Sequence, residues 1–310
     1  MSKLITIAGT GRSGTNVLKT IFGSHPDVAS LHFETRFLID PRGLISFYRF
    51  YTACWSPYMA DYLIKDLEDY LLSLAKISNE NSDSIPYADW ELDRWIPNYS
   101  ELVTELIQNL TQFNYEAKWP GAKVGSEPYT MSFGKMMEKD ELAAFLSTFM
   151  IRITGSICAS QGKSLFVDDN THAILFASDI NELLPSSKLI HIVRDPRDVI
   201  SSLLSQKWTP NTVEYCTFWY KNVVKKWMEQ QKLLSPDFFT PIKLEDLVAE
   251  PEKHIKELCT FCSITFNPKM LTVSLSESNS GRYLIDLTQD EIEFIEKETA
   301  AEAAHLGYTY

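Results

Sequence analysis

An arginine inside a glycine-rich loop near the start of the chain raises the first question of chemistry. The apolar run 4–8 leads into a loop with the spacing Gly9-x-Gly11-x-x-Gly14, and a helical pattern follows. This spacing is that of a dinucleotide-binding turn, in which Glu34, 20 residues after the last glycine, would bind a ribose hydroxyl. Arg12 instead favours a loop around a concentrated anion, because a guanidinium is a charge-assisted donor.

A nucleoside-triphosphate loop is disfavoured by the residues after the last glycine. That motif needs a lysine followed by serine or threonine, to reach the β- and γ-phosphates. Here Gly14 is followed by Thr15 and Asn16. The sequence therefore argues against a kinase or an ATPase.

A second anion site is predicted in segment 188–208, where a strand pattern runs directly into a helix start. Asp195 is the predicted N-cap, Pro196 occupies the first helical position and Asp198 follows in the first turn. Arg194 then lies at the carboxyl end of the strand, where open α/β sheets bind ligands, and Ser202 projects from the helix. An arginine and a hydroxyl near a helix start favour a phosphate. The alternative is a structural pairing of Arg194 with an aspartate.

The elements that must position these residues are short apolar runs with helical segments between several of them. Strands are predicted at 4–8, 28–33, 165–167, 189–193 and 239–244. This alternation predicts an α/β fold of three layers, α/β/α, with a central, mostly parallel sheet. At the end of the chain, Thr288 with Glu291 predicts a capped acidic helix that Gly307 closes.

The middle of the chain has a different texture. We expect residues 1–310 to form a single domain in which 40–155 is a helical insertion over the active edge of the sheet. If the protein transfers a group, this insertion would cover the side where the acceptor molecule binds. The insertion is rich in aromatic residues, and Trp55 and Tyr58, with Arg36 just before it, are candidate acceptor contacts. The alternative for most of its aromatic residues is ordinary helical core; they include Tyr48, Tyr51, Trp90 and Trp95.

Composition limits the partners. The chain has 310 residues, a formal net charge of −12 and 45% hydrophobic residues. Nucleic acids and anionic membranes are disfavoured, because binding them needs clustered Lys and Arg. The apolar stretch 142–158 is interrupted by Arg152 and Gly155 and is predicted to be too short to span a membrane.

The start of the chain lacks the pattern of a secretory signal. Five scattered cysteines indicate reduced thiols rather than a disulfide framework, and Cys259 and Cys262 indicate buried thiols rather than a zinc site. We expect a cytoplasmic protein without a metal.

Together the two anion motifs resemble the signature of sulfotransferases that use 3′-phosphoadenosine 5′-phosphosulfate (PAPS). The motifs are Gly11-Arg12-Ser13-Gly14-Thr15 and Arg194-Asp195-Pro196-Arg197-Asp198-Val199 with Ser202. Two later segments are also similar to that family, Lys243-Leu244-Glu245-Asp246-Leu247 and Ser280-Gly281-Arg282-Tyr283. The resemblance covers about residues 1–40 and 165–310.

This resemblance implies a P-loop-NTPase-like fold and in-line transfer of a sulfuryl group from PAPS to an acceptor hydroxyl or amine, with no metal. It assigns the 5′-phosphosulfate to the loop Gly11, Arg12, Ser13, Gly14, Thr15 and Asn16, with Arg12 where many relatives have lysine. It assigns the 3′-phosphate to Arg194 and Ser202, and Arg282 to a late loop that closes on the nucleotide.

Two residues compete for the role of the base that takes the acceptor's proton. Glu34 lies in His32-Phe33-Glu34-Thr35-Arg36, which resembles a Glu-Thr-Arg stretch of tyrosylprotein sulfotransferases in which the glutamate is the base. His172 precedes Arg194 at a distance similar to that of the catalytic histidine of cytosolic small-molecule sulfotransferases, but Asn170 stands where those enzymes carry a basic residue. We favour Glu34; its structural alternative is an ion pair with Arg36 on one strand face.

Two other functional classes stay open from the residues alone. One is an NAD(P)-dependent oxidoreductase with a Rossmann turn at Gly9 to Gly14, and the other is a nucleotide-binding protein without catalysis. The acceptor can be a small-molecule hydroxyl, a glycan, a lipid or a peptide tyrosine. The oligomeric state is left undetermined by the sequence.

Overall fold

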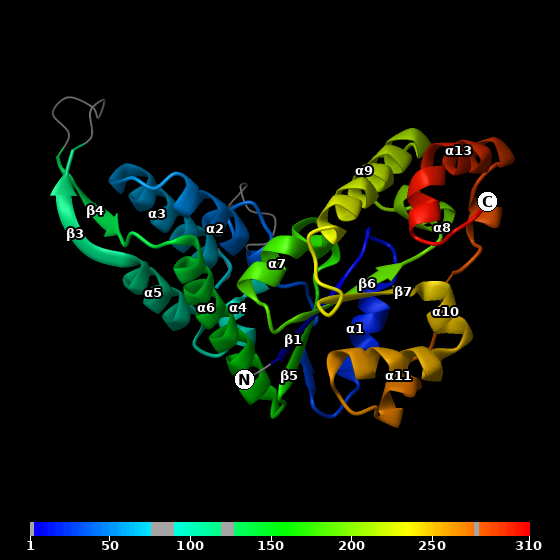
Figure 1. Ribbon diagram of the computed structural model, residues 1–310, viewed down its shortest axis with the longest axis horizontal. Coiled ribbons are helices and arrows are strands. Elements are labelled where there is room, and N and C mark those ends of the chain that lie inside the picture. The colour runs from blue at the N-terminus through cyan, green and yellow to red at the C-terminus, as the bar shows by residue number, and fades with distance from the viewer. Residues whose placement is uncertain (1–2, 76–89, 119–126, 276–278) are drawn as a thin grey trace. The chain divides into compact units, whose positions relative to one another are not determined.

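The computed structural model describes residues 3–75, 90–118, 127–275 and 279–310. The chain divides into two compact units, one of residues 36–161 and one of residues 3–35 with 162–310 (Figure 1). Both anion motifs belong to the second of these, which we call the sheet unit. Residues 36–161 are called the middle unit.

The sheet of the sheet unit contains five parallel strands among the described residues. They are β1 (Lys3–Ala8), β2 (Val28–Ser30), β5 (Leu165–Asp169), β6 (Lys188–Val193) and β7 (Phe239–Lys243), in the order β2-β5-β1-β6-β7. All five predicted strands are confirmed. The second is shorter than predicted and ends at Ser30 rather than at residue 33. A few residues later, the backbone N–H and hydroxyl of Thr35 bond the Asp168 side chain.

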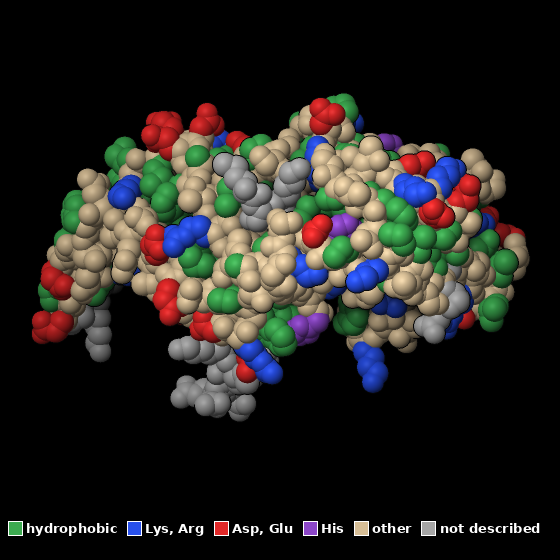
Figure 2. Space-filling model, turned by 90° about the horizontal axis from the view of Figure 1, so that it is seen from below, with side chains coloured by type: hydrophobic (Ala, Val, Ile, Leu, Met, Phe, Trp, Pro, Cys, Tyr) green, Lys and Arg blue, Asp and Glu red, His purple; other side chains and the backbone are tan. Residues whose placement is uncertain are grey.

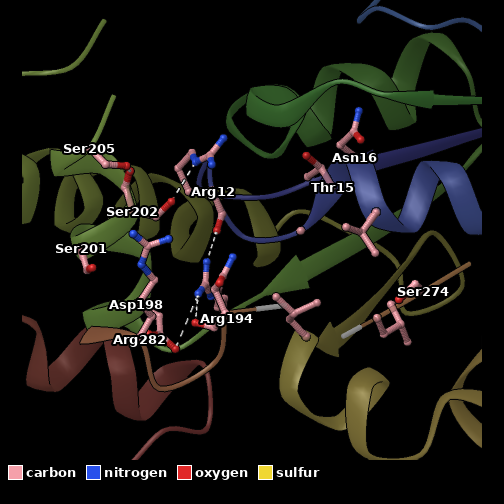
Figure 3. A pocket seen from close by; sticks show the side chains of 15 residues that line it. Arg12, Thr15, Asn16, Arg194, Asp198, Ser201, Ser202, Ser205, Ser274 and Arg282 are labelled. Atoms are coloured by element: carbon pink, nitrogen blue, oxygen red, sulfur yellow. Dashed lines mark hydrogen bonds and ion pairs between the residues drawn. The ribbon is translucent and has the colours of Figure 1, made fainter. Parts of the chain in front are cut away.

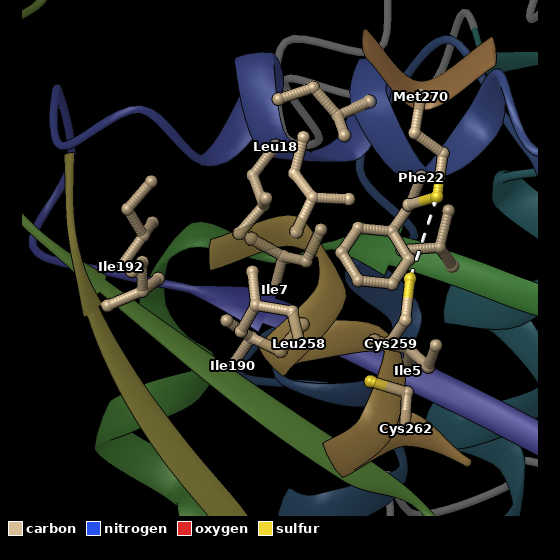
Figure 4. Close-up of a cluster of buried hydrophobic side chains, with 14 of the residues drawn as sticks. Ile5, Ile7, Leu18, Phe22, Ile190, Ile192, Leu258, Cys259, Cys262 and Met270 are labelled. Carbon is tan, nitrogen blue, oxygen red and sulfur yellow. Dashed lines mark hydrogen bonds between the residues drawn. The ribbon is translucent and has the colours of Figure 1, made fainter. Parts of the chain in front are cut away.

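Helices cover both faces of this sheet. One face packs on α1 (Thr15–Gly23), α10 (Leu244–Ala249) and α11 (Pro251–Cys262), and Figure 4 shows Ile5, Ile7, Ile190 and Ile192 of the strands against Leu18, Phe22 and Leu258. The short helix η4 (Pro268–Thr272) adds Met270, whose sulfur accepts a hydrogen bond from the Cys259 thiol.

The opposite face packs on helices that include α9 (Val213–Gln231). His191 alternates with Ile190 and Ile192 along β6 and lies 4.5 Å, ring to ring, from Trp227 of α9. Burial lowers the pKa of His191 to about 3, so this histidine is a neutral core residue. Helix α9 in turn packs on α7 (Ala177–Leu183), α8 (Pro196–Leu204) and α13 (Gln289–His305). The three-layer prediction is therefore confirmed.

The predicted helix ends are also confirmed. The Asp195 carboxylate accepts the backbone N–H of Arg197 at 2.9 Å, and Pro196 begins α8. Thr288 and Glu291 form a reciprocal capping box at the start of α13, and Gly307 follows its end at φ +81°. The remaining elements of this unit are η3 (Thr171–Phe176) and α12 (Tyr283–Asp286).

The middle unit is largely helical. It contains η1 (Arg36–Leu38), α2 (Leu44–Ala53), α3 (Pro57–Ser73), α4 (Leu92–Trp95), α5 (Tyr99–Leu110) and α6 (Lys139–Gln161). An antiparallel hairpin, β3 (Thr111–Ala117) with β4 (Tyr129–Gly134), was not predicted. Residues of β3 are exposed or half-buried on both faces, so the sequence lacks the apolar alternation that marks a half-buried strand.

The length of helix α6 corrects the prediction that the apolar stretch 142–158 is too short to span a membrane. It runs for 23 residues through Arg152 and Gly155, and by length and composition it could cross a membrane. Half of its most apolar window is buried within the fold, and it packs on α2 and α5. Core helices of water-soluble proteins meet the same criterion.

Candidate nucleotide site

The glycine-rich loop between β1 and α1 is tightly packed and has an unusual backbone. A Cβ at Gly9 would lie 2.1 Å from Ser13 Oγ and 2.8 Å from the Ile192 carbonyl oxygen, so only glycine fits there. Gly11, Arg12 and Gly14 have φ values of +85°, +56° and +105°. Left-handed residues close together in a loop gather backbone N–H groups into a concave anion site.

The start of α1 adds further donors to this loop. Gly14 is its N-cap and has no side chain to bond the first-turn amides, which also lack intrahelical acceptors. Thr15 and Asn16 begin the helix, and both line the same cavity as Arg12. Ser13 differs from them, since its hydroxyl is buried beside Gly9 under the loop. The local structure is therefore a helix N-terminus open to an anion.

The second motif meets this loop directly. Arg12 Nε donates to Ser202 Oγ at 2.9 Å, across 190 residues of sequence, and Arg194 Nη1 donates to the Arg12 carbonyl oxygen at 3.2 Å. The two motifs share a cavity of about 370 Å³ (Figure 3). Arg282 also lines it, so three guanidinium groups contribute to one cavity of a chain whose net charge is −12.

Lys and Arg side chains are otherwise interspersed with acidic and hydrophobic ones on the face drawn in Figure 2. On this face the basic side chains therefore do not gather into one large patch.

Arg194 is buried, with 6% of its surface exposed. Its Nη2 donates to the Asn279 carbonyl oxygen at 2.6 Å and lies 3.8 Å from the Asp198 carboxylate. Its Nε has no hydrogen-bond partner among the described residues. Burial lowers the pKa of Arg194, although the negative charges of Asp198 and Glu245 oppose that shift. The long ion pair with Asp198 leaves hydrogen-bonding capacity in a buried cation, which an anionic ligand would satisfy.

A late loop is fastened over this cavity by Asp198. The buried carboxylate accepts the backbone N–H groups of Gly281 at 2.7 Å and Tyr283 at 3.0 Å. Arg282, between them, lines the cavity and pairs with Asp286 at 2.7 Å. Asp198 was predicted only as a first-turn residue of α8, and its role in holding the late loop was missed because the contact spans 83 residues.

Both candidate bases lie beside the glycine-rich loop. Glu34 is half-buried and its Oε1 accepts the hydroxyl of Thr171 at 2.6 Å. The Thr171 hydroxyl oxygen also lies 3.4 Å from Thr15 Oγ1, at the start of α1. His172 Nε2 lies 4.0 Å from the position of a Cβ built on Gly11.

Thr171 was missed by the sequence reasoning. A signal for it was present, since it follows the predicted strand 165–167 within a polar run at the carboxyl end of that strand. The predicted shared strand face of Glu34 and Arg36 is wrong, because β2 ends at Ser30. Arg36 instead begins η1 and donates to Asp40 at 2.8 Å.

The predicted acceptor contacts lie in the middle unit. Trp55 packs edge-on against Phe133 with ring centroids 5.7 Å apart, and Tyr58 is 49% exposed. Tyr48 and Tyr51 are fully buried core, so for them the alternative interpretation was correct.

Strand order separates this loop from a dinucleotide-binding turn. In the Rossmann order the second strand of the chain lies next to the first. Here β5, the third strand of this sheet along the chain, lies between β1 and β2. The strand order of this sheet therefore differs from the Rossmann order, and a Rossmann turn at Gly9 to Gly14 is not supported.

Comparison with known proteins agrees with this geometry. Residues 66–268 match a family model described as the sulfotransferase family. Protein-tyrosine sulfotransferase 1 of Danio rerio is 31% identical over 96 residues, which are 29% of this chain and 26% of that protein. The match thus spans about a quarter of that relative's length.

Among solved structures, a sulfotransferase from Alicyclobacillus acidocaldarius superimposes with a TM-score of 0.50 at 11% identity, over 100% of this chain and 98% of the other. The sulfotransferase domain of the Synechococcus PCC 7002 olefin synthase gives 0.48 at 15% identity, over 100% and 96%. With the matched family model and the shared α/β fold, the chain belongs to the sulfotransferase family.

Proposed function

We propose that this protein transfers a sulfuryl group from PAPS to an acceptor hydroxyl or amine. The observation that carries the proposal is the hydrogen bond from Arg12 to Ser202, which joins two motifs 190 residues apart at one cavity with three arginines. A nucleotide with separate 5′ and 3′ anionic groups matches two adjoining anion sites.

In this proposal the loop from Gly11 to Asn16 holds the 5′-phosphosulfate. Gly11, Ser13 and Gly14 contribute backbone amides, and Thr15 and Asn16 stand at the helix start. Arg12 stabilises the charge that develops on the leaving phosphate oxygen. The donor supplies the sulfuryl group on a phosphate leaving group, and the protein's part is positioning and charge stabilisation.

The 3′-phosphate is assigned to Arg194 and Ser202. The Arg194 guanidinium lines the cavity, where it would donate to this phosphate. Arg282 lies on the late loop at the edge of the same cavity, where it would close on the nucleotide. No metal is part of this proposal, since the three guanidinium groups supply positive charge.

Glu34 is the proposed base. Its carboxylate accepts a hydrogen bond from Thr171, whose hydroxyl lies beside Thr15, the first residue of α1. A base must lie near the acceptor's proton while the sulfuryl group is held in line. His172 is the second candidate, because it also adjoins Gly11.

The acceptor side is proposed to involve residues 40–155, with Arg36, Trp55 and Tyr58 as contacts. The similarity to a protein-tyrosine sulfotransferase supports an acceptor with a phenolic hydroxyl, and small molecules, glycans and lipids are the other classes to test. We propose a cytoplasmic location, because all five cysteines are free thiols and four of them are buried.

Calorimetric titration tests the nucleotide assignment. We expect adenosine 3′,5′-bisphosphate to bind and NADH to show no saturable binding. Tight binding of NADH alone would overturn the proposal. Incubation with [³⁵S]PAPS and a cell extract then tests catalysis, and failure to label any acceptor would favour a nucleotide-binding protein without activity.

The two candidate bases are separated by substitution. Glu34→Gln keeps the size of the side chain and removes its basicity, so we expect a loss of turnover of about 100-fold or more. His172→Ala should retain most turnover. The reverse order would move the role of base to His172.

A further inference from the structure

Thr35, the residue directly after Glu34, is held on three sides by the end of β5. Its backbone N–H donates to Asp168 Oδ1 at 3.2 Å, and its hydroxyl donates to Asp168 Oδ2. Asn170 Nδ2 donates to the Thr35 carbonyl oxygen at 2.8 Å. We call Thr35, Asp168 and Asn170 the Thr35 clamp.

The clamp is buried although every member is polar. Thr35 is 3% exposed, Asp168 5% and Asn170 1%. Both carboxylate oxygens of Asp168 and the backbone groups of Thr35 are paired, whereas Asn170 Oδ1 has no hydrogen-bond partner among the described residues. Breaking a bond of this buried network leaves a further polar group unsatisfied away from water, and that cost makes the network rigid. Since β2 ends at Ser30, these bonds rather than a strand ladder fix the backbone beside Glu34.

Residues 168–171, the run that contains Asp168 and Asn170, also contact the Glu34 carboxylate and helix α1. Thr171, directly after Asn170, donates to Glu34 Oε1. Asp169, directly after Asp168, forms a buried ion pair with Lys19 of α1 at 2.6 Å. Residues 168–171 thus form one frame that contacts Glu34, its neighbour Thr35 and the helix that begins the anion loop.

We propose that Asp168 and Asn170 are positioning residues that act through Glu34 by holding Thr35. The inference rests on the proposed function, since it takes Glu34 as the base. General-base catalysis depends on the placement of the carboxylate to within a fraction of an ångström, so a loosened clamp lowers turnover without touching the nucleotide cavity.

Two matched pairs of variants separate the clamp from simple packing. Thr35→Val removes the hydroxyl donor at nearly constant volume, whereas Thr35→Ser keeps it. Asp168→Ala removes both acceptors, whereas Asp168→Asn keeps one acceptor for the Thr35 N–H and offers an amide N–H to the Thr35 hydroxyl oxygen. The conservative member of each pair should behave like the wild type.

Amide hydrogen exchange read by mass spectrometry tests the clamp without any turnover. We expect peptides that cover 31–37 to exchange about 10-fold faster in Thr35→Val and Asp168→Ala, and at the wild-type rate in Thr35→Ser and Asp168→Asn. The dissociation constant of adenosine 3′,5′-bisphosphate should change less than threefold in all four. Unchanged exchange in both disruptive variants would overturn the clamp.

A double-mutant cycle with Glu34→Gln tests whether the clamp acts through that carboxylate. Release of labelled sulfate from [³⁵S]PAPS to water serves as the reaction, which requires no identified acceptor. We expect Thr35→Val to lower kcat about 10-fold or more in the wild type, with little change in KM, and to have no further effect in Glu34→Gln.

The outcomes distinguish the two proposals. An equal loss from Thr35→Val in both backgrounds would overturn positioning through Glu34. Full activity of Glu34→Gln would overturn the assignment of the base. If the wild type neither releases sulfate to water nor labels any acceptor in the extract, the proposed function is overturned. The exchange measurement decides the clamp in either case.

Discussion

Replacing Arg194 by methionine should weaken binding of the 3′-phosphate selectively. The guanidinium is buried, contacts the carbonyl oxygens of Arg12 and Asn279, and keeps its Nε without a partner among the described residues. A hydrogen bond to a charged group contributes about 1.5–3 kcal/mol. Losing one such bond and part of the local charge, about 3 kcal/mol together, corresponds to a dissociation constant raised about 100-fold.

The assay compares two ligands that differ only in the 3′-phosphate. In calorimetric titration the dissociation constant of adenosine 3′,5′-bisphosphate should rise about 100-fold, whereas that of adenosine 5′-monophosphate should change less than threefold. Arg197→Met is a matched control three residues further along the chain, because Arg197 pairs with Asp195 and Glu296 and does not line the cavity. Equal weakening of both ligands by Arg194→Met would refute the assignment.

Loss of Arg194 also affects the fold to a limited extent. Asp198 keeps the backbone N–H groups of Gly281 and Tyr283 as donors, so its buried carboxylate still has hydrogen-bond partners. Thermal unfolding of the variant should therefore remain cooperative, and the binding comparison is made on folded protein.

Three further predictions follow from local contacts. Gly9→Ala should lower both the melting temperature and bisphosphate affinity, because the added Cβ meets Ser13 Oγ at 2.1 Å; unchanged calorimetry and binding would contradict the close packing. Burial raises the pKa of Asp168 from 3.8 to about 7. Between these pH values the folded chain retains a proton that the unfolded chain has lost. The contribution of this carboxyl to the free energy of unfolding therefore falls by about 4 kcal/mol as pH rises from about 4 to about 7. Urea unfolding from pH 4.5 to 7.5 should show that fall in the wild type relative to Asp168→Asn, and a difference independent of pH would be the contrary result. Thr288→Ala should cost about 1 kcal/mol of unfolding free energy through the lost capping box and leave bisphosphate affinity unchanged.

Local features of the fold could be predicted because their causes lie within a few residues. The five strands follow from short apolar runs, since strands buried on both faces need apolar side chains throughout. The start of α8 follows from Asp195 and Pro196, whose side chains act on the adjacent turn. The β3–β4 hairpin could not be predicted from periodicity, because β3 has no buried face.

The candidate site could be predicted in its parts but not in its assembly. Arg12 and Arg194 were found from their motifs, whereas the contact between Arg12 and Ser202 depends on the side-by-side pairing of β1 and β6. Thr171 and the Thr35 clamp depend on β5 lying between β2 and β1. Strand order arises from long-range packing, which no short window of sequence records.

By itself the sequence determined the residue types that can hold phosphate and the helix starts that present them, because glycine conformations, caps and apolar runs act locally. Tertiary structure decided against the dinucleotide-binding interpretation of the glycine-rich loop, since the strand order differs from that of a Rossmann half. It also decided the surroundings of Glu34, where residues more than 130 positions away along the chain supply its hydrogen bond and hold its neighbour Thr35. Those contacts exist only when β5 is inserted beside β2, and that insertion is a property of the folded core.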